Sequence, residues 1–167
     1  MTSRRTLLRG FVAALVALCA APALSQTSSS PAEPVRKLYA TYGTGDSRAQ
    51  GFSENDAATL LSTGLLAIYR RAAKAGMDAD FFVQGQDFNL AKPIDITEVE
   101  MSGDRARIAA TLTQTDADAS GKPKQRVDRF IFTLVRESGV WKIDDALHGK
   151  DSARASWQAT IRSGGVR

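Results

Sequence analysis

The stretch ITEVEMSGDRARIAATL, residues 96–112, decides the fold class because its apolar residues recur with the two-residue period of a β-strand. Small and apolar side chains occupy every second position of its second half: Ala106, Ile108, Ala110 and Leu112. Residues 102–104, Ser-Gly-Asp, are typical of a turn and separate this strand from an earlier one over residues 94–101. The apolar phase of the earlier strand shifts between Ile96 and Val99, and a β-bulge there would restore one apolar face.

The same period continues toward the C-terminus. Residues 127–137 place Phe130, Phe132 and Leu134 on one face, and Ser138-Gly139 favours a tight hairpin. Residues 140–146 form the returning strand. The pattern therefore predicts a meander of four antiparallel strands.

Toward the N-terminus the apolar period is helical. Residues 34–42 carry one stripe, and residues 53–75 carry a second, with a capping box at Ser53 and Asp56. Gly64 falls in the middle of this second helix, where a close contact with the sheet would explain it. Helices that are separate in sequence from an antiparallel sheet indicate an α+β fold. We expect two N-terminal helices packed on a curved four-stranded antiparallel sheet, a cone with an apolar mouth.

The first 25 residues have the pattern of a cleavable export signal. Three arginines precede an unbroken apolar run over residues 11–21, which is shorter than the roughly 20 residues of a membrane-spanning helix. Residues 3–9 resemble the twin-arginine export motif, with an ordinary Sec signal as the alternative. We expect cleavage between Ser25 and Gln26, no lipid anchor at Cys19, and a soluble periplasmic chain.

Export would also change how the charge is interpreted. The chain has 22 basic and 18 acidic residues, and three arginines lie in the predicted signal, so 19 basic residues would face 18 acidic ones. This near balance gives no indication of nucleic-acid binding. The expected organisation is a signal over residues 1–25, a polar linker over 26–33, one domain over 34–147, and an extension over 148–167 with a short helix on Trp157 and Ile161.

Three motifs resemble those of a known family. QDF at residues 86–88, the opening stretch at 96–112 and GVWKIDDAL at 139–147 are similar to the exported bacterial family of unknown function 3828, within the NTF2-like, or cystatin-like, superfamily. The resemblance covers residues 34–147 and implies a fold and a periplasmic location rather than a reaction. Some members have cysteines near the QDF position, and this chain has none there.

The segment FVQGQDFN, residues 82–89, joins the helical half to the β-rich half. Its phenylalanines, with the preceding Phe81, lie around Gly85, and its amide and carboxyl groups can satisfy backbone groups that lack partners. We interpret it as an apolar plug that closes the cone. Exposed phenylalanines would instead indicate a contact surface.

The side chains that would line the mouth of such a cone are the candidates for a site. Ligand-binding candidates are Tyr39, Tyr42, Tyr69, Phe82, Phe88 and Trp141. Weak catalytic candidates are Asp80, Asp87, Asp144 and Tyr39. Enzymes of similar fold, such as ketosteroid isomerase, use an Asp base with Tyr and protonated Asp donors in an apolar cavity.

The sequence lacks the residues that metal binding and phosphate binding require. His148 is the only histidine, so no metal cluster can form around it, and we expect it at the surface. Residues 116–122, DADASGK, imitate half of a calcium loop, but Val127 stands where the bidentate Glu is needed. There is no phosphate-binding glycine loop. We therefore expect no metal and no cofactor.

Three functions remain open. The first is a non-enzymatic module that binds a small apolar ligand or a protein of the cell envelope. The second is a cofactor-free cavity enzyme, which needs an inward Asp with a raised pKa beside a Tyr. The third is an inhibitor or immunity-type protein. A homodimer through the sheet face is compatible with each of them.

Overall fold

The structure, a computed structural model, describes residues 30–42, 51–85, 90–91, 93–117 and 121–164. Its helices are α1 (Glu33–Ala40), α2 (Glu54–Leu60), α3 (Thr63–Lys74) and α4 (Ala153–Ser163). Its strands are β1 (Asp95–Ser102), β2 (Arg105–Ala117), β3 (Pro123–Glu137), β4 (Val140–His148) and β5 (Asp151–Ser152). The predicted α+β class is confirmed. The predicted signal, with Ser25 and Gln26, lies outside the described residues.

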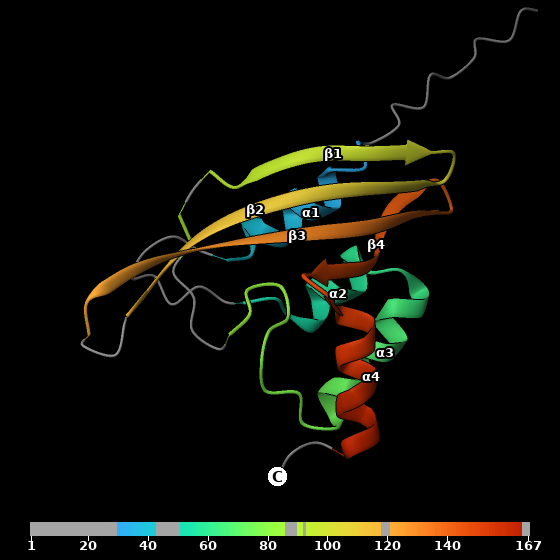
Figure 1. Cartoon of the computed structure of the whole chain (residues 1–167). Helices are drawn as coiled ribbons and strands as arrows, with labels where there is room; N and C mark the ends of the chain where they lie inside the picture. Colours follow the sequence, from blue (N-terminus) through green and yellow to red (C-terminus); the bar gives the residue numbers. More distant parts are fainter. Residues whose placement is uncertain (1–29, 43–50, 86–89, 92, 118–120, 165–167) are drawn as a thin grey trace, which may run out of the picture.

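One antiparallel sheet runs in the order β1-β2-β3-β4-β5, so each strand pairs with its neighbour in sequence (Figure 1). The pairing of β1 with β2 shifts register between Glu98 and Glu100, which confirms the predicted bulge near Val99. The predicted strand count was one short, because the two residues of β5 are too few to show an apolar period.

The helix expected over residues 53–75 is two helices. The capping box of α2 is present as predicted, with Ser53 and Asp56 bonded to each other's backbone N–H groups. Leu61 and Ser62, however, are extended. Ser62 N donates to Ile143 O on β4 at 2.8 Å, and Ser62 Oγ caps α3 by accepting from Leu65 N at 3.1 Å. Pairing with β4 thus replaces one turn of the expected helix.

The explanation offered for Gly64 was wrong. Gly64 is the second residue of α3 rather than the middle of a long helix. A Cβ placed on it would have as its nearest neighbour Arg154 Nη1 at 3.9 Å, an ordinary contact. The sheet does not require a glycine here.

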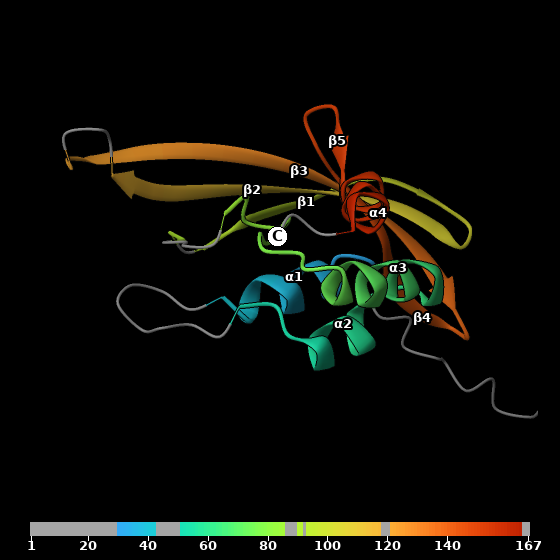
Figure 2. The ribbon, with the colours of Figure 1, turned by 90° about the horizontal axis from the view of Figure 1, so that it is seen from below.

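The interior of the fold is filled by aromatic rings of the chain itself. Helices α1, α2 and α3 lie on one side of the sheet (Figure 2). Between the two layers Tyr39, Tyr42, Phe82, Phe130 and Phe132 are at most 2% exposed. Phe82 stacks on Phe132 with ring centroids 6.0 Å apart. The expected open mouth of a cone is therefore occupied.

The predicted C-terminal helix is confirmed as α4. Ser152 caps its N-terminus by accepting from Ala155 N at 3.0 Å, and Gly164 ends it in the left-handed conformation at φ 72°. Trp157 is 2% exposed and contacts Tyr69 and Phe82 edge to face. Burial of this indole makes α4 part of the hydrophobic core.

Of the plug predicted at residues 82–89, with Phe81 before it, the structure describes residues 81–85. Phe81 and Phe82 are buried, as the plug interpretation requires. Asp80 and Gly85 exchange two backbone hydrogen bonds of 3.2 and 3.4 Å, which close a tight loop. Asp87 and Phe88, with Gln86, lie outside the described residues.

No helix in the described part of the chain is long and apolar enough to cross a membrane.

Candidate functional site

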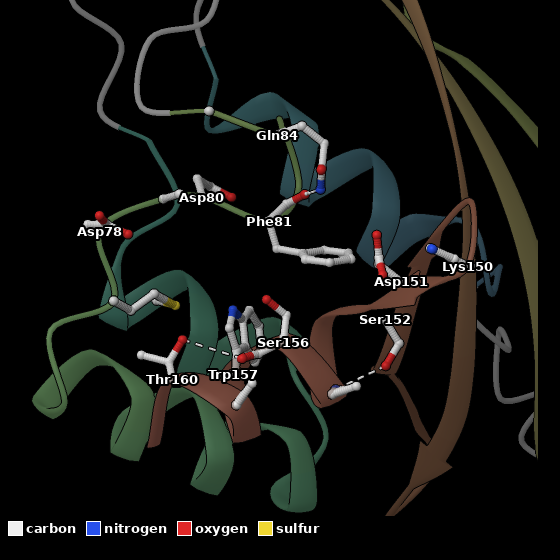
Figure 3. A pocket seen from close by; sticks show the side chains of 15 residues that line it. Asp78, Asp80, Phe81, Gln84, Lys150, Asp151, Ser152, Ser156, Trp157 and Thr160 are labelled. Carbon is white, nitrogen blue, oxygen red and sulfur yellow. Dashed lines mark hydrogen bonds between the residues drawn. The ribbon is translucent and has the colours of Figure 1, made fainter. Parts of the chain in front are cut away.

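A pocket of about 580 Å³ lies between the segment over residues 77–85 and helix α4 (Figure 3). One wall is made by residues 77–81 and 84–85, and the other by the turn at 150–152 and one face of α4. A second pocket of about 150 Å³ shares residues 77–81 and Trp157 with the first. Phe52, Tyr69 and Phe82 complete this smaller pocket.

Both walls are held by local hydrogen bonds. Gln84 adopts a left-handed backbone at φ 54°, and its side-chain amide donates to Phe81 O at 2.7 Å. On the opposite wall Gly149 supplies the positive φ of the turn after β4. Ser152 then starts α4 as its N-cap. The pocket is therefore bordered by a fixed loop and a capped helix.

Asp80 lies where the two pockets meet. Its Oδ2 accepts from the Tyr42 hydroxyl at 2.6 Å, and its Oδ1 accepts from Phe82 N at 2.8 Å. Burial raises the pKa of Asp80 above its ordinary value of 3.8, and hydrogen bonds from Tyr42 and from the backbone of Phe82 and Phe52 offset this only in part. Asp80 is the catalytic candidate that faces a pocket, and it stands beside a tyrosine.

The tyrosines of the candidate set divide into two groups. Burial, reinforced by the charge of Asp80, raises the pKa of Tyr39 and Tyr42 well above 10.0, so both hydroxyls stay protonated at neutral pH. Neither residue lines the two pockets. Tyr69 lines the smaller one, and burial together with the charge of Glu54 raises its pKa.

Trp141 and Asp144 lie away from the two pockets. Trp141 is buried at the start of β4, with the Arg136 guanidinium 4.6 Å from its ring centroid. Asp144 Oδ1 accepts from Ser62 Oγ at 2.6 Å and from Arg154 Nη2 at 2.8 Å. This carboxylate joins the start of α3 to α4 through β4, so its contacts are structural.

The sequence did not single out Asp128, which is the centre of a buried polar network. Asp128 accepts from Gln114 Nε2 at 2.9 Å and from Arg126 Nε at 2.8 Å, and lies 3.2 Å from His148 Nε2. His148, expected at the surface, is half-buried and stacks on Phe130 at 4.8 Å. One signal was available, because Asp128 shares the apolar phase of Phe130.

This network fastens the two walls of the pocket to the sheet. Val83 O, in the loop, accepts from Gln114 Nε2 at 2.9 Å and from Arg126 Nη2 at 3.2 Å. His148 ends β4 just before the turn at 150–152. Asp128 therefore connects the loop on one side of the pocket with the turn on the other.

The chemistry of the larger pocket is mixed. Phe81, Trp157 and Met77 supply apolar surface, and the charged residues of the lining are three aspartates and one lysine: Asp78, Asp80, Asp151 and Lys150. Within the described residues no group of three or more His, Cys, Asp or Glu side chains is placed to hold a metal ion. The lining suits the binding of a small molecule by apolar contact and carboxylate hydrogen bonds.

Comparisons with known proteins add little to this geometry. No family model and no curated protein matches the sequence. One solved structure, the intermembrane space region of the chloroplast protein ARC6, is similar over 71% of this chain and 90% of that chain, at 21% identity and a TM-score of 0.37. A score this low does not show a shared fold.

Proposed function

We propose that this chain is a non-enzymatic binding module that holds a small ligand between residues 77–85 and α4. The observation that carries the proposal is the pocket of about 580 Å³, a size typical of small-molecule sites. Its lining combines polar side chains with the buried rings of Phe81 and Trp157. The expected binding region, the interior of the cone, is filled, so the proposed site is displaced toward the C-terminal helix.

We also propose that the module is an exported NTF2-like domain. The order of helices followed by an antiparallel meander supports the superfamily, and the motifs at residues 86–88 and 139–147 support the family of unknown function 3828. The arginine-rich start and apolar run of the first 25 residues support a periplasmic location.

A cofactor-free cavity enzyme is the second candidate, because one specific observation favours it. Asp80 combines a raised pKa, a hydrogen bond from Tyr42 and a position on both pockets. The binding proposal is preferred because Asp80 already accepts three hydrogen bonds, two of them from backbone N–H groups. Such a carboxylate resembles the anchor of a tight loop more than a free general base.

A fragment screen followed by amide chemical shifts tests the binding proposal. Ala155 lines the pocket from α4, so Ala155→Trp should fill it, whereas Gln158→Trp adds the same ring on the same helix outside the lining. We expect fragments to shift the amides of residues 77–85 and 150–160 in the wild type and in Gln158→Trp, but not in Ala155→Trp. A diverse library without any such fragment would overturn the proposal.

The enzyme candidate is tested with the same fragments. Asp80→Asn keeps the size of the side chain and an acceptor for Phe82 N, so a binding module should retain its uncharged fragments. Any fragment that the wild type converts to a product and Asp80→Asn does not would favour the enzyme instead.

A further inference from the structure

We propose that the pocket between residues 77–85 and α4 selects an organic cation, a ligand that carries an amine or quaternary ammonium group on an apolar body. This inference rests on the proposed function and names the ligand class of the same site. Three features of the lining support it: carboxylates outside any ion pair of the described residues, an apolar wall, and a helix N-terminus that has two of its first amides already hydrogen-bonded.

The carboxylates of the pocket lining form no ion pair among the described residues. Asp78 and Asp151 are exposed at its rim, and Asp80 is more buried. Among the described residues none of the ion pairs involves these three side chains. Lys150 is the one basic residue of the lining, so the local balance is negative. A bound cation would supply the missing opposite charge.

The burial of Asp80 also favours a positively charged ligand. The pKa of this carboxyl is raised because burial in the protein desolvates its charged form. A positive group in the pocket would favour the charged form and oppose that desolvation. A neutral ligand would bury Asp80 further without compensating it.

The aromatic wall fits the apolar part of such a ligand. Figure 3 shows the Phe81 ring and the Trp157 indole on the pocket, with Ser156 beside them. Both rings are fixed by edge-to-face contacts, Trp157 on Tyr69 at 5.3 Å and Phe81 on Phe130 at 6.3 Å. Trp157 is only 2% and Phe81 9% exposed, so the two rings give the ligand a small apolar contact, and the attraction to a positive charge comes from the carboxylates.

The start of α4 could in principle favour an anion, because a helix N-terminus carries partial positive charge. Two of the first amides of α4 already donate to acceptors within the chain, however. Arg154 N donates to Asp145 Oδ1 at 3.0 Å, and Ala155 N donates to Ser152 Oγ at 3.0 Å. Two of the amides that could bind an anion are thus used within the chain, and the carboxylates of the lining remain the main charges beside the ligand.

Three molecules of nearly equal shape test the sign of the ligand. Choline is the cation, 3,3-dimethylbutan-1-ol the neutral isostere and 3,3-dimethylbutanoate the anion, each titrated against the full chain with amide chemical shifts as the readout. We expect choline to shift residues 77–85 and 150–160 with a dissociation constant about tenfold lower than that of the alcohol, the size expected from several partly screened carboxylates.

Asp151→Asn is the informative variant, because the side chain is exposed and its change leaves the core intact. It should weaken choline about threefold and leave the alcohol unchanged. Asp104→Asn, an exposed acid in the turn between β1 and β2, is the matched control and should affect neither probe. Equal binding of choline and the alcohol, or tighter binding of the anion, would overturn the cation proposal and leave the binding function standing. Failure of every fragment at these amides would overturn both.

Discussion

At the scale of single residues, Asp80 contacts both the core and the pocket. It accepts from the buried Tyr42 hydroxyl and the Phe82 amide, and it also lines the pocket. Because the folded chain holds the Asp80 proton more tightly than the unfolded chain, the free energy of unfolding should fall as pH rises from about 3.8 through the raised pKa of Asp80.

Asp80→Asn should remove this contribution. Asn has no charge to desolvate, so the variant should gain stability relative to the wild type as pH rises through that window. Urea unfolding at several pH values from 4 to 7 checks it, with Asp104→Asn as the control for an exposed acid. Parallel stability curves for the wild type and Asp80→Asn would show that burial does not perturb this carboxyl.

Asp128 should matter more for stability than any exposed acid. Asp128→Ala leaves Gln114 Nε2, Arg126 and His148 without their shared acceptor, and breaking a buried charged network costs about 3 kcal/mol. Glu100→Ala, on the exposed edge strand with Arg107 at 3.9 Å, should cost less than about 0.5 kcal/mol. Chemical unfolding of the two variants measures the difference, and equal losses would contradict the role given to Asp128.

At the scale of secondary-structure elements, capping and strand pairing determine where the helices begin and end. Two serines with the same apparent role differ in burial: Ser53 caps α2 at the surface, whereas Ser62 caps α3 from a buried position and also donates to Asp144. Ser62→Ala removes a cap and leaves a carboxylate short of one donor, whereas Ser53→Ala removes an exposed capping box.

We expect the serine variants to rank accordingly. Ser62→Ala should lower the free energy of unfolding by about 2 kcal/mol and Ser53→Ala by about 1 kcal/mol. Thermal and urea unfolding of the pair provide the measurement. If Ser53→Ala cost as much as Ser62→Ala, the break between α2 and α3 would not depend on the contacts described for it.

The elements differ in how well the sequence predicted them. The four long strands, the bulge near Val99 and the cap at Ser53 follow from local periods and spacings and are confirmed, although β3 begins at Pro123 rather than at residue 127. The break at Leu61 and Ser62 was missed because it depends on a hydrogen bond to Ile143, which is 81 residues away in the chain. Local patterns hold no information on such pairing.

The site was predicted less well than the fold, and the reason lies at the scale of the whole molecule. The pocket forms where residues 77–85 meet α4, two segments separated by the whole sheet in sequence. Aromatic residues at helical spacing, such as Tyr39 and Tyr42, fill the core rather than a cavity. Of the catalytic candidates, Asp80 lies on the pocket, Tyr39 and Asp144 do not, and Asp87 is outside the described residues.

Export is a prediction about the whole chain. We expect the protein produced in a bacterium to be recovered from the periplasm with residues 1–25 removed, because the arginines, the apolar run and the small residues near Ser25 follow the order of a signal. Intact mass spectrometry checks it. A species that begins at Gln26 agrees with the prediction, whereas a chain that keeps residues 1–25 would remove the basis for a periplasmic location.

The most direct test of the central claim, that the pocket beside α4 holds a small ligand, is native mass spectrometry of the chain recovered from the periplasm without added ligand. The account predicts extra mass that leaves as a cation on activation, present in the wild type and Gln158→Trp and absent from Ala155→Trp. A wild-type chain as free of extra mass as Ala155→Trp, or extra mass that Ala155→Trp retains, would contradict it.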